Sequence, residues 1–239
     1  LEKAEEANII DRRVAPGTKN IAQGPAMTPE ACKKALLAGE EMVRDMAEAG
    51  YRLIAVGEMG IGNTTTASAV ACALTGAEVS RMTGRGAGLS DEGLARKVAA
   101  IERALAVNHP DRDDPVGVLA KVGGFDIAAM AGAFLGGAKY GVAVLVDGFI
   151  ASVAALCAQR MMPEARDFML ASHVSREPAG AFLLEQLGLT PILAAGMALG
   201  EGTGAVAVMP LIDMALAVYR GATFGDIAVA AYVPQEGGT

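Results

Sequence analysis

The stretch that most constrains the fold is residues 52–66, which read RLIAVGEMGIGNTTT. A short apolar run ends at Gly57, and a carboxylate, two more glycines, an asparagine and three threonines follow. This order predicts a buried strand, a glycine-rich turn and a helix N-terminus, where free backbone N–H groups can bind an anion. Glu58 is unusual there, because its negative charge repels a phosphate. We therefore expect chemistry beside the phosphate, on a base or a cationic ring.

Strand and helix patterns alternate along the rest of the chain. The clearest strand is VAVLV at residues 142–146, a β-branched run that suits burial on both faces of a parallel sheet. Ligands bind such sheets at the carboxyl ends of the strands, so the loops after Val56, Val146 and Ala171 should share one face. The other predicted strands are 53–56 and 168–171, and the predicted helices are 29–49, 64–74, 91–107, 116–122, 126–138, 149–161, 178–187 and 205–219, with 192–195 ambiguous. The alternation predicts an α/β fold of three layers with a mainly parallel sheet.

The composition indicates one compact domain. The 239 residues are 52% hydrophobic, which is enough for a sizeable core. We divide the chain into an irregular segment at 1–28, a large domain at 29–220 and a tail at 221–239. The formal net charge of −7 argues against nucleic-acid and membrane-surface partners, although local amides and cations can still hold a small anion.

The cysteines and histidines do not suggest a metal site. Cys32, Cys72 and Cys157 lie far apart without metal-ligand spacing, so we expect reduced thiols in a cytoplasmic protein. The two histidines, His109 and His173, are also distant from each other. No apolar stretch is long and unbroken enough for a membrane span, and no signal peptide is predicted.

A second glycine-rich loop, GRGAG, lies at residues 84–88. Its glycines permit a close backbone approach to an anion, and Lys97 on the following helix can reach back with a positive charge. The alternative is a flexible surface loop with a solvated lysine. Asp147, at the end of the clearest strand, suits ribose hydroxyls or a catalytic partner, or it simply caps the next helix.

A second glutamate among glycines, Glu201 in LGEGTGA, echoes GEMGIG. It lies between two apolar stretches, which predicts partial desolvation and a raised pKa, as a general base near neutral pH requires. The alternative is a charge that stabilises the dipole of a helix N-terminus. GEMGIG is neither the dinucleotide fingerprint nor a Walker loop, so a purely structural turn is an equal alternative. His173 shows no partners of the Ser/His/Asp kind and is interpreted as a packing histidine.

Seven ordered motifs resemble those of the nicotinate-nucleotide:dimethylbenzimidazole phosphoribosyltransferases. They are GTKNIAQGPAMT, GEMGIGNTT, GRGAGLSDEGLARK, LAKVGGFDIAAMAG, VLVDGF, SHVSRE and LGEGTGA. The resemblance implies a Rossmann-like domain, a homodimer, and transfer of phosphoribose from nicotinate mononucleotide to 5,6-dimethylbenzimidazole or a related base. The pyridinium is already a good leaving group, so no metal and no cofactor are implied.

The resemblance also assigns roles to individual residues. Glu201 is the implied general base, and Glu58 is implied to stabilise positive charge on the ribose or to position the base. Met59 and Leu199 are implied to flank the base. The residues predicted to bind the nucleotide and its phosphate are Gly60, Ile61, Gly62, Asn63, Gly84, Gly86, Ala87, Lys97, Asp147 and Ser175.

The chain departs from the family pattern at its N-terminus. Family members carry a further segment before the position of Leu1, and this segment contributes to a small domain and to the walls of the base pocket. We expect a fragment, a truncated homologue or a core, in which the nucleotide half of the site is the better preserved. The alternative function is a non-catalytic or impaired nucleotide-binding module. A dehydrogenase is disfavoured, because the dinucleotide fingerprint is missing.

Overall fold

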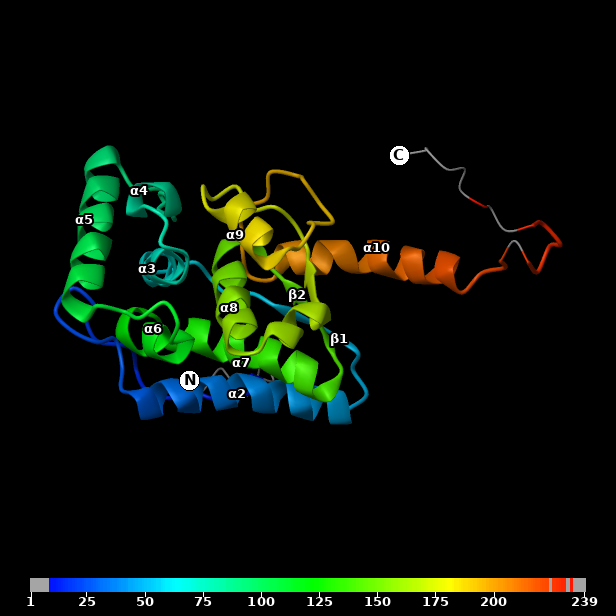
Figure 1. Ribbon diagram of the computed structural model, residues 1–239, viewed down its shortest axis with the longest axis horizontal. Helices are drawn as coiled ribbons and strands as arrows, with labels where there is room; N and C mark the ends of the chain where they lie inside the picture. The colour runs from blue at the N-terminus through cyan, green and yellow to red at the C-terminus, as the bar shows by residue number, and fades with distance from the viewer. Residues whose placement is uncertain (1–8, 224, 231–232, 234–239) are drawn as a thin grey trace.

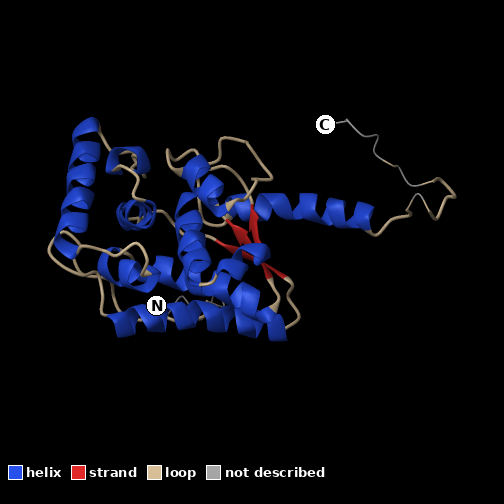
Figure 2. Cartoon of the chain, viewed as in Figure 1, coloured by secondary structure: helices blue, strands red, loops and turns tan. Residues whose placement is uncertain are grey.

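The computed structural model describes residues 9–223, 225–230 and 233. Three parallel strands form a sheet in the order β1-β2-β3 among many helices (Figures 1 and 2). The strands are β1 (Leu53–Val56), β2 (Ala143–Val146) and β3 (Met169–Ala171). The helices are α2 (Pro29–Glu48), α3 (Thr64–Thr75), α4 (Val79–Met82), α5 (Asp91–Asn108), α6 (Pro115–Val122), α7 (Phe125–Tyr140), α8 (Gly148–Met161), the 3₁₀ helix η1 (Pro163–Phe168), α9 (Gly180–Leu187) and α10 (Thr203–Tyr219).

The sheet lies between two helical layers. Val146 of β2 is in register with Val56 of β1 and with Ala171 of β3, so the three strands end at one level. Val144 and Val146 point into the main core with α7 and α8, whereas Leu145 packs against the first turns of α10 on the opposite face. The rest of α10 runs away from the sheet (Figure 1). The predicted α/β fold with a parallel sheet is confirmed.

Small residues allow the helices to pack closely. At the contact between α2 and α7, a Cβ on Gly39 would overlap the carbonyl oxygen of Ala129. A Cβ on Gly132 would likewise overlap the carbonyl oxygen of Leu36. The main chains of the two helices therefore touch, and this contact explains part of the glycine and alanine content.

The predicted helices and strands are all present, with bounds that differ by at most two residues. The sequence analysis missed only the short α4 and η1. Within 192–195, Leu193 forms an isolated parallel bridge with His173. The division into three segments stays a prediction, and residues 1–8, 224, 231–232 and 234–239 lie outside the described part.

The three cysteines are buried free thiols. Burial raises the pKa of Cys32 to about 11 and that of Cys72 to about 12, so both stay protonated near neutral pH. Across the residues that the structure describes, no helix combines the length and the apolarity needed to cross a membrane.

Candidate functional site

The loops that leave the three strands line one cavity at the carboxyl edge of the sheet. Glu58 follows β1, Asp147 follows β2, and His173 follows β3. Leu199 and Gly200, from the loop that precedes α10, complete the wall. The prediction that these loops share one face is therefore confirmed, and the cavity lies where parallel sheets bind ligands.

Glu58 is half-buried in this wall. Its Oε2 atom accepts hydrogen bonds from the backbone N–H of Gly60 and from Nδ2 of Asn63, the latter at 2.7 Å. Burial raises the pKa of Glu58, and the negative charges of Asp126 and Asp147 raise it further against these two hydrogen bonds. A positive charge brought next to this carboxyl group would favour its ionised form.

Glu201 lies on a turn that packs against the turn of Glu58. Its backbone N–H donates to the carbonyl oxygen of Glu58, with 2.7 Å between the two atoms. Its φ of 59° is left-handed, which is strained for a residue with a Cβ. The predicted desolvation of Glu201 is wrong for this structure, because its side chain is exposed. Its apolar neighbours Leu199 and Val206 are 69% and 58% exposed themselves, so they provide no cover.

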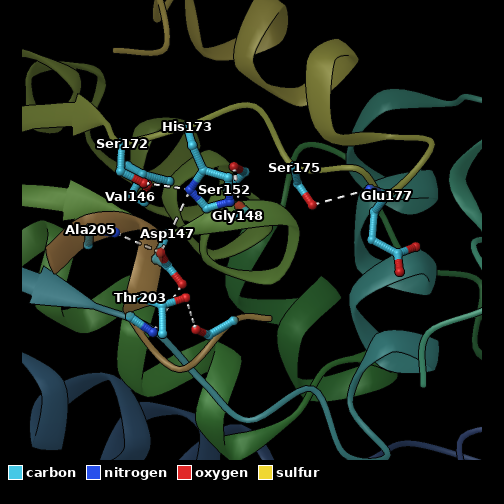
Figure 3. Close-up of polar contacts among 12 residues, drawn as sticks. Val146, Asp147, Gly148, Ser152, Ser172, His173, Ser175, Glu177, Thr203 and Ala205 are labelled. Carbon is cyan, nitrogen blue, oxygen red and sulfur yellow. Dashed lines mark hydrogen bonds and ion pairs between the residues drawn. The ribbon is translucent and has the colours of Figure 1, made fainter. Parts of the chain in front are cut away.

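Asp147 is buried and holds the Glu201 turn in place (Figure 3). One carboxylate oxygen accepts from the backbone N–H of Gly202 at 3.0 Å, and the other from that of Ala205 at 2.9 Å. It therefore caps α10 rather than α8, the helix that follows it in sequence, to which its side chain makes no capping bond. A contact between Asp147 and ribose stays a prediction, since both oxygens already accept amide hydrogens.

His173 is buried beside Asp147 (Figure 3). Its Nδ1 atom lies 2.9 Å from Oγ of Ser172 and 3.8 Å from a carboxylate oxygen of Asp147. Because Ser172 donates its hydroxyl hydrogen to the carbonyl of Val146, we assign the Nδ1 hydrogen to the imidazole. The structure thus places a serine and an aspartate beside His173, which corrects the expectation that it has no such partners, and the ring also lines the cavity. Its interpretation as a packing histidine stays a prediction.

A second cavity adjoins the first and is lined with cations. The two cavities share Gly60, Thr64 and Ala87, and Arg85, Arg96 and Lys97 line the second. Thr64 and Thr65, at the N-terminus of α3, line the same cavity, and a helix N-terminus together with these cations suits a phosphate group.

Lys97 is buried at the base of this second cavity, so the alternative of a solvated lysine is wrong. Its Nζ atom donates to Oγ1 of Thr64 and to the carbonyl oxygen of Gly84, each at 2.9 Å. Desolvation lowers the pKa of Lys97, and the charge of Glu177 opposes this change. An ammonium group has three donors, so one remains for a ligand.

The structure places most of the predicted site residues around the two cavities. Met59, Gly60, Gly86, Ala87, Asp147, Ser175 and Leu199 line the first, and Gly60, Ile61, Gly62, Ala87 and Lys97 line the second. Gly84 accepts the bond from Lys97. Asn63 and Glu201 line neither cavity: Asn63 is hydrogen-bonded to Glu58, and Glu201 is exposed on the turn that is bonded to the turn of Glu58. In the described part of the chain, no group of three His, Cys, Asp or Glu side chains could hold a metal ion.

The residues at the site that the sequence analysis missed include Thr64, Arg96, Asp126 and Glu177. Thr64 and Arg96 lie inside the quoted motifs GEMGIGNTT and GRGAGLSDEGLARK, so the motifs could have pointed to them. Asp126 and Glu177 act across long sequence separations, on Asn63 and Lys97 respectively. A local sequence pattern does not predict contacts between residues so far apart in the chain.

Comparison with known proteins points to one family. The profile of a family described as phosphoribosyltransferase matches residues 1–229. Relatives named nicotinate-nucleotide–dimethylbenzimidazole phosphoribosyltransferase are 47% identical over 228 residues in Acetivibrio thermocellus and 50% identical over 218 residues in Pseudomonas aeruginosa. These alignments cover 95% and 91% of this chain, and 65% and 62% of the two relatives. The crystal structure of CobT from Thermus thermophilus matches with a TM-score of 0.88 at 48% identity, covering 93% of this chain and 66% of that one.

Proposed function

The chain belongs to the nicotinate-nucleotide–dimethylbenzimidazole phosphoribosyltransferase family, and on this premise we propose that it transfers phosphoribose from nicotinate mononucleotide to a benzimidazole-type base. The products are nicotinate and an α-riboside 5′-phosphate. The observation that carries the proposal is the pairing of Glu58 and Glu201 on two bonded turns, beside a cavity that adjoins a cation-lined one. The chain spans about 65% of the length of the first relative, so the activity is proposed for this chain rather than transferred to it.

The two cavities match the two ends of the mononucleotide. The 5′-phosphate occupies the second cavity, where the backbone N–H of Gly62, the guanidinium of Arg96 and the third donor of Lys97 are available, whereas the N–H of Gly60 is bonded to Glu58. The ribose then lies where the two cavities meet, next to Thr64, which lines both. The cationic pyridinium ring reaches Glu58, whose carboxyl group becomes ionised beside it.

The transfer is a single displacement at C1′ of the ribose. The bond from C1′ to the pyridinium nitrogen breaks, and its electron pair leaves with nicotinate. A ring nitrogen of the acceptor base bonds to C1′ from the opposite face, which inverts the β-riboside to α. Glu201 accepts the proton that the acceptor loses. An acceptor held between the exposed side chains of Met59 and Leu199 would cover the Glu201 turn and remove water from it.

Release of nicotinate tests this proposal. Purified chain is incubated with nicotinate mononucleotide, with and without dimethylbenzimidazole, and the products are separated by chromatography. We expect nicotinate release that depends on the base, and a decrease of about 10²-fold or more in Glu201→Gln. Glu185→Gln, an exposed glutamate of α9 outside both cavities, is the matched control. Equal turnover by the two variants contradicts the assignment of Glu201 as the base.

The second candidate function is a nucleotide-binding module without turnover. It is favoured by the exposure of Met59 and Leu199, which leaves the acceptor side of the cavity open. Calorimetry distinguishes the two, because binding of the mononucleotide without base-dependent turnover supports the module. We also propose a cytoplasmic homodimer, as is typical of the family. Sedimentation of the purified chain tests the dimer.

A further inference from the structure

One carboxyl oxygen of Glu58 accepts hydrogen bonds, and the other accepts none from the described residues. Oε2 accepts from the backbone N–H of Gly60 and from Nδ2 of Asn63. Among the described residues, Oε1 accepts no hydrogen bond. Oε1 lies toward Gly200, where an added Cβ would come within 3.8 Å of it, and Gly200 lines the first cavity. The free edge of the carboxyl group therefore faces the place where a substrate binds.

The hydrogen bond from Asn63 to Glu58 is part of a chain that continues to helix α7. Nδ2 of Asn63 donates its other hydrogen to Oδ2 of Asp126, in the first turn of α7, at 2.7 Å. Oδ1 of Asn63 is buried without a partner, so no group competes for the orientation of the amide. Asn63 occupies the N-cap position of α3, but its side chain makes no capping bond. The hydrogen bonds of this side chain thus go to two carboxylates.

We propose that Asn63 and Asp126 are positioning residues for Glu58. The carboxylate of Asp126 orients the amide of Asn63, and the amide holds Oε2 of Glu58 so that Oε1 points at the reacting sugar and ring. The catalytic consequence rests on the proposed function, but the hydrogen-bond chain itself does not. In this scheme neither residue touches the substrate, and neither lines the two cavities of the site.

Asn63 and Asp126 act on the charge of Glu58 in opposite directions. The hydrogen bond from Asn63 lowers the pKa of Glu58, whereas the negative charge of Asp126 raises it. The titratable groups around Glu58 are Asp126, Asp147, His173, Glu177, Glu201 and, beyond Thr64, Lys97. Asn63→Ala should therefore raise the pKa of Glu58, and Asp126→Asn should lower it. Asp126→Asn keeps an oxygen that can accept from Asn63, so it removes the charge without releasing the amide.

Titration by NMR tests the proposal without any need for activity. The side-chain carboxyl carbon of Glu58 is followed against pH in the full chain, assigned by comparison with Glu58→Gln. We expect the midpoint to move up in Asn63→Ala and down in Asp126→Asn. Glu30→Gln, an exposed acid in the first turn of α2, is the control and should leave the midpoint unchanged. The proposal is overturned if the midpoint of the Glu58 titration is unchanged in both variants, or if it shifts in the same direction in both.

Kinetics then add the catalytic consequence. In an active chain, Asn63→Ala should lower kcat by up to about 10²-fold, with a smaller change in KM for the mononucleotide, because orientation rather than binding is lost. The acid limb of the kcat profile should move with the NMR midpoint. If the wild-type chain shows no turnover, the proposed function fails while the titration still decides the positioning role. Asn63→Ser repeats the test should the alanine variant not fold.

Discussion

The backbone N–H of Glu201 donates a hydrogen bond to the carbonyl oxygen of Glu58, with 2.7 Å between the two atoms. The same contact brings Gly57 so close to Gly202 that a Cβ on Gly57 would overlap the amide nitrogen of Gly202. Two turns from distant parts of the chain, each carrying a glutamate, are thus held together by main-chain contacts. Asp147 stabilises the Glu201 turn by accepting hydrogen bonds from the backbone N–H groups of Gly202 and Ala205. The spacing of the two main-chain turns that carry these glutamates therefore depends on backbone packing.

Substituting Gly57 by alanine tests that packing. The added Cβ must push the two turns apart, so we expect a loss of about 1–3 kcal/mol in the free energy of unfolding together with a lower kcat. Chemical denaturation and the nicotinate assay measure the two effects. Gly17→Ala is the control, because its Cβ would meet no atom within 4 Å. Equal stability of the two variants would mean that the turns can separate freely.

Glu201→Gly should stabilise the chain while it abolishes turnover. The left-handed φ of 59° costs a residue with a Cβ about 1 kcal/mol, and glycine removes this strain. Glu201→Ala loses the same carboxylate but keeps the strain, so it should be less stable than Glu201→Gly by that amount. Thermal denaturation compares them, and equal melting temperatures would contradict a strained turn.

Lys97→Met should weaken binding of the mononucleotide. A hydrogen bond to a charged group contributes about 1.5–3 kcal/mol, which corresponds to roughly a 10- to 100-fold increase in Kd. Calorimetry measures the Kd, and Lys33→Met on the exposed face of α2 is the control. Because burial lowers the pKa of Lys97, the affinity of the wild-type chain should also decline at alkaline pH earlier than an ordinary lysine would allow. An unchanged Kd in Lys97→Met would remove it from the phosphate site.

Glu58→Gln should become relatively more stable as the pH rises. A raised pKa means that the folded state keeps its proton where the unfolded state has lost it, so ionisation destabilises the fold above the ordinary value of 4.5. Glutamine never ionises and can still accept from Gly60 and Asn63. We expect the difference in melting temperature between the variant and wild type to grow as the pH rises above the ordinary value of 4.5. A constant difference would contradict the raised pKa.

Local patterns in the sequence were sufficient for the elements and for the loops that carry the site. Thr28 caps α2, Gly57 ends β1, and the apolar run of β2 leads directly to Asp147. Each of these signals lies within a few residues of the element boundary that it marks. The parallel sheet follows from the alternation of elements, and it brings the three loops to one edge. Three of the seven family motifs, GEMGIGNTT, VLVDGF and SHVSRE, lie at these loops.

Only the tertiary structure decided the environment of each charged group. Lys97 is buried because Thr64 and Gly84 come to it from elsewhere in the chain, and Glu201 is exposed although apolar residues surround it in sequence. Asp147 caps α10, which lies across the sheet from its own helix α8. Burial and hydrogen bonding depend on atoms that are close in space, and a local pattern records only which residues are close in sequence. The sequence by itself thus determined the elements, the turns and the family, and the fold determined which charges are shielded, tethered or open to a ligand.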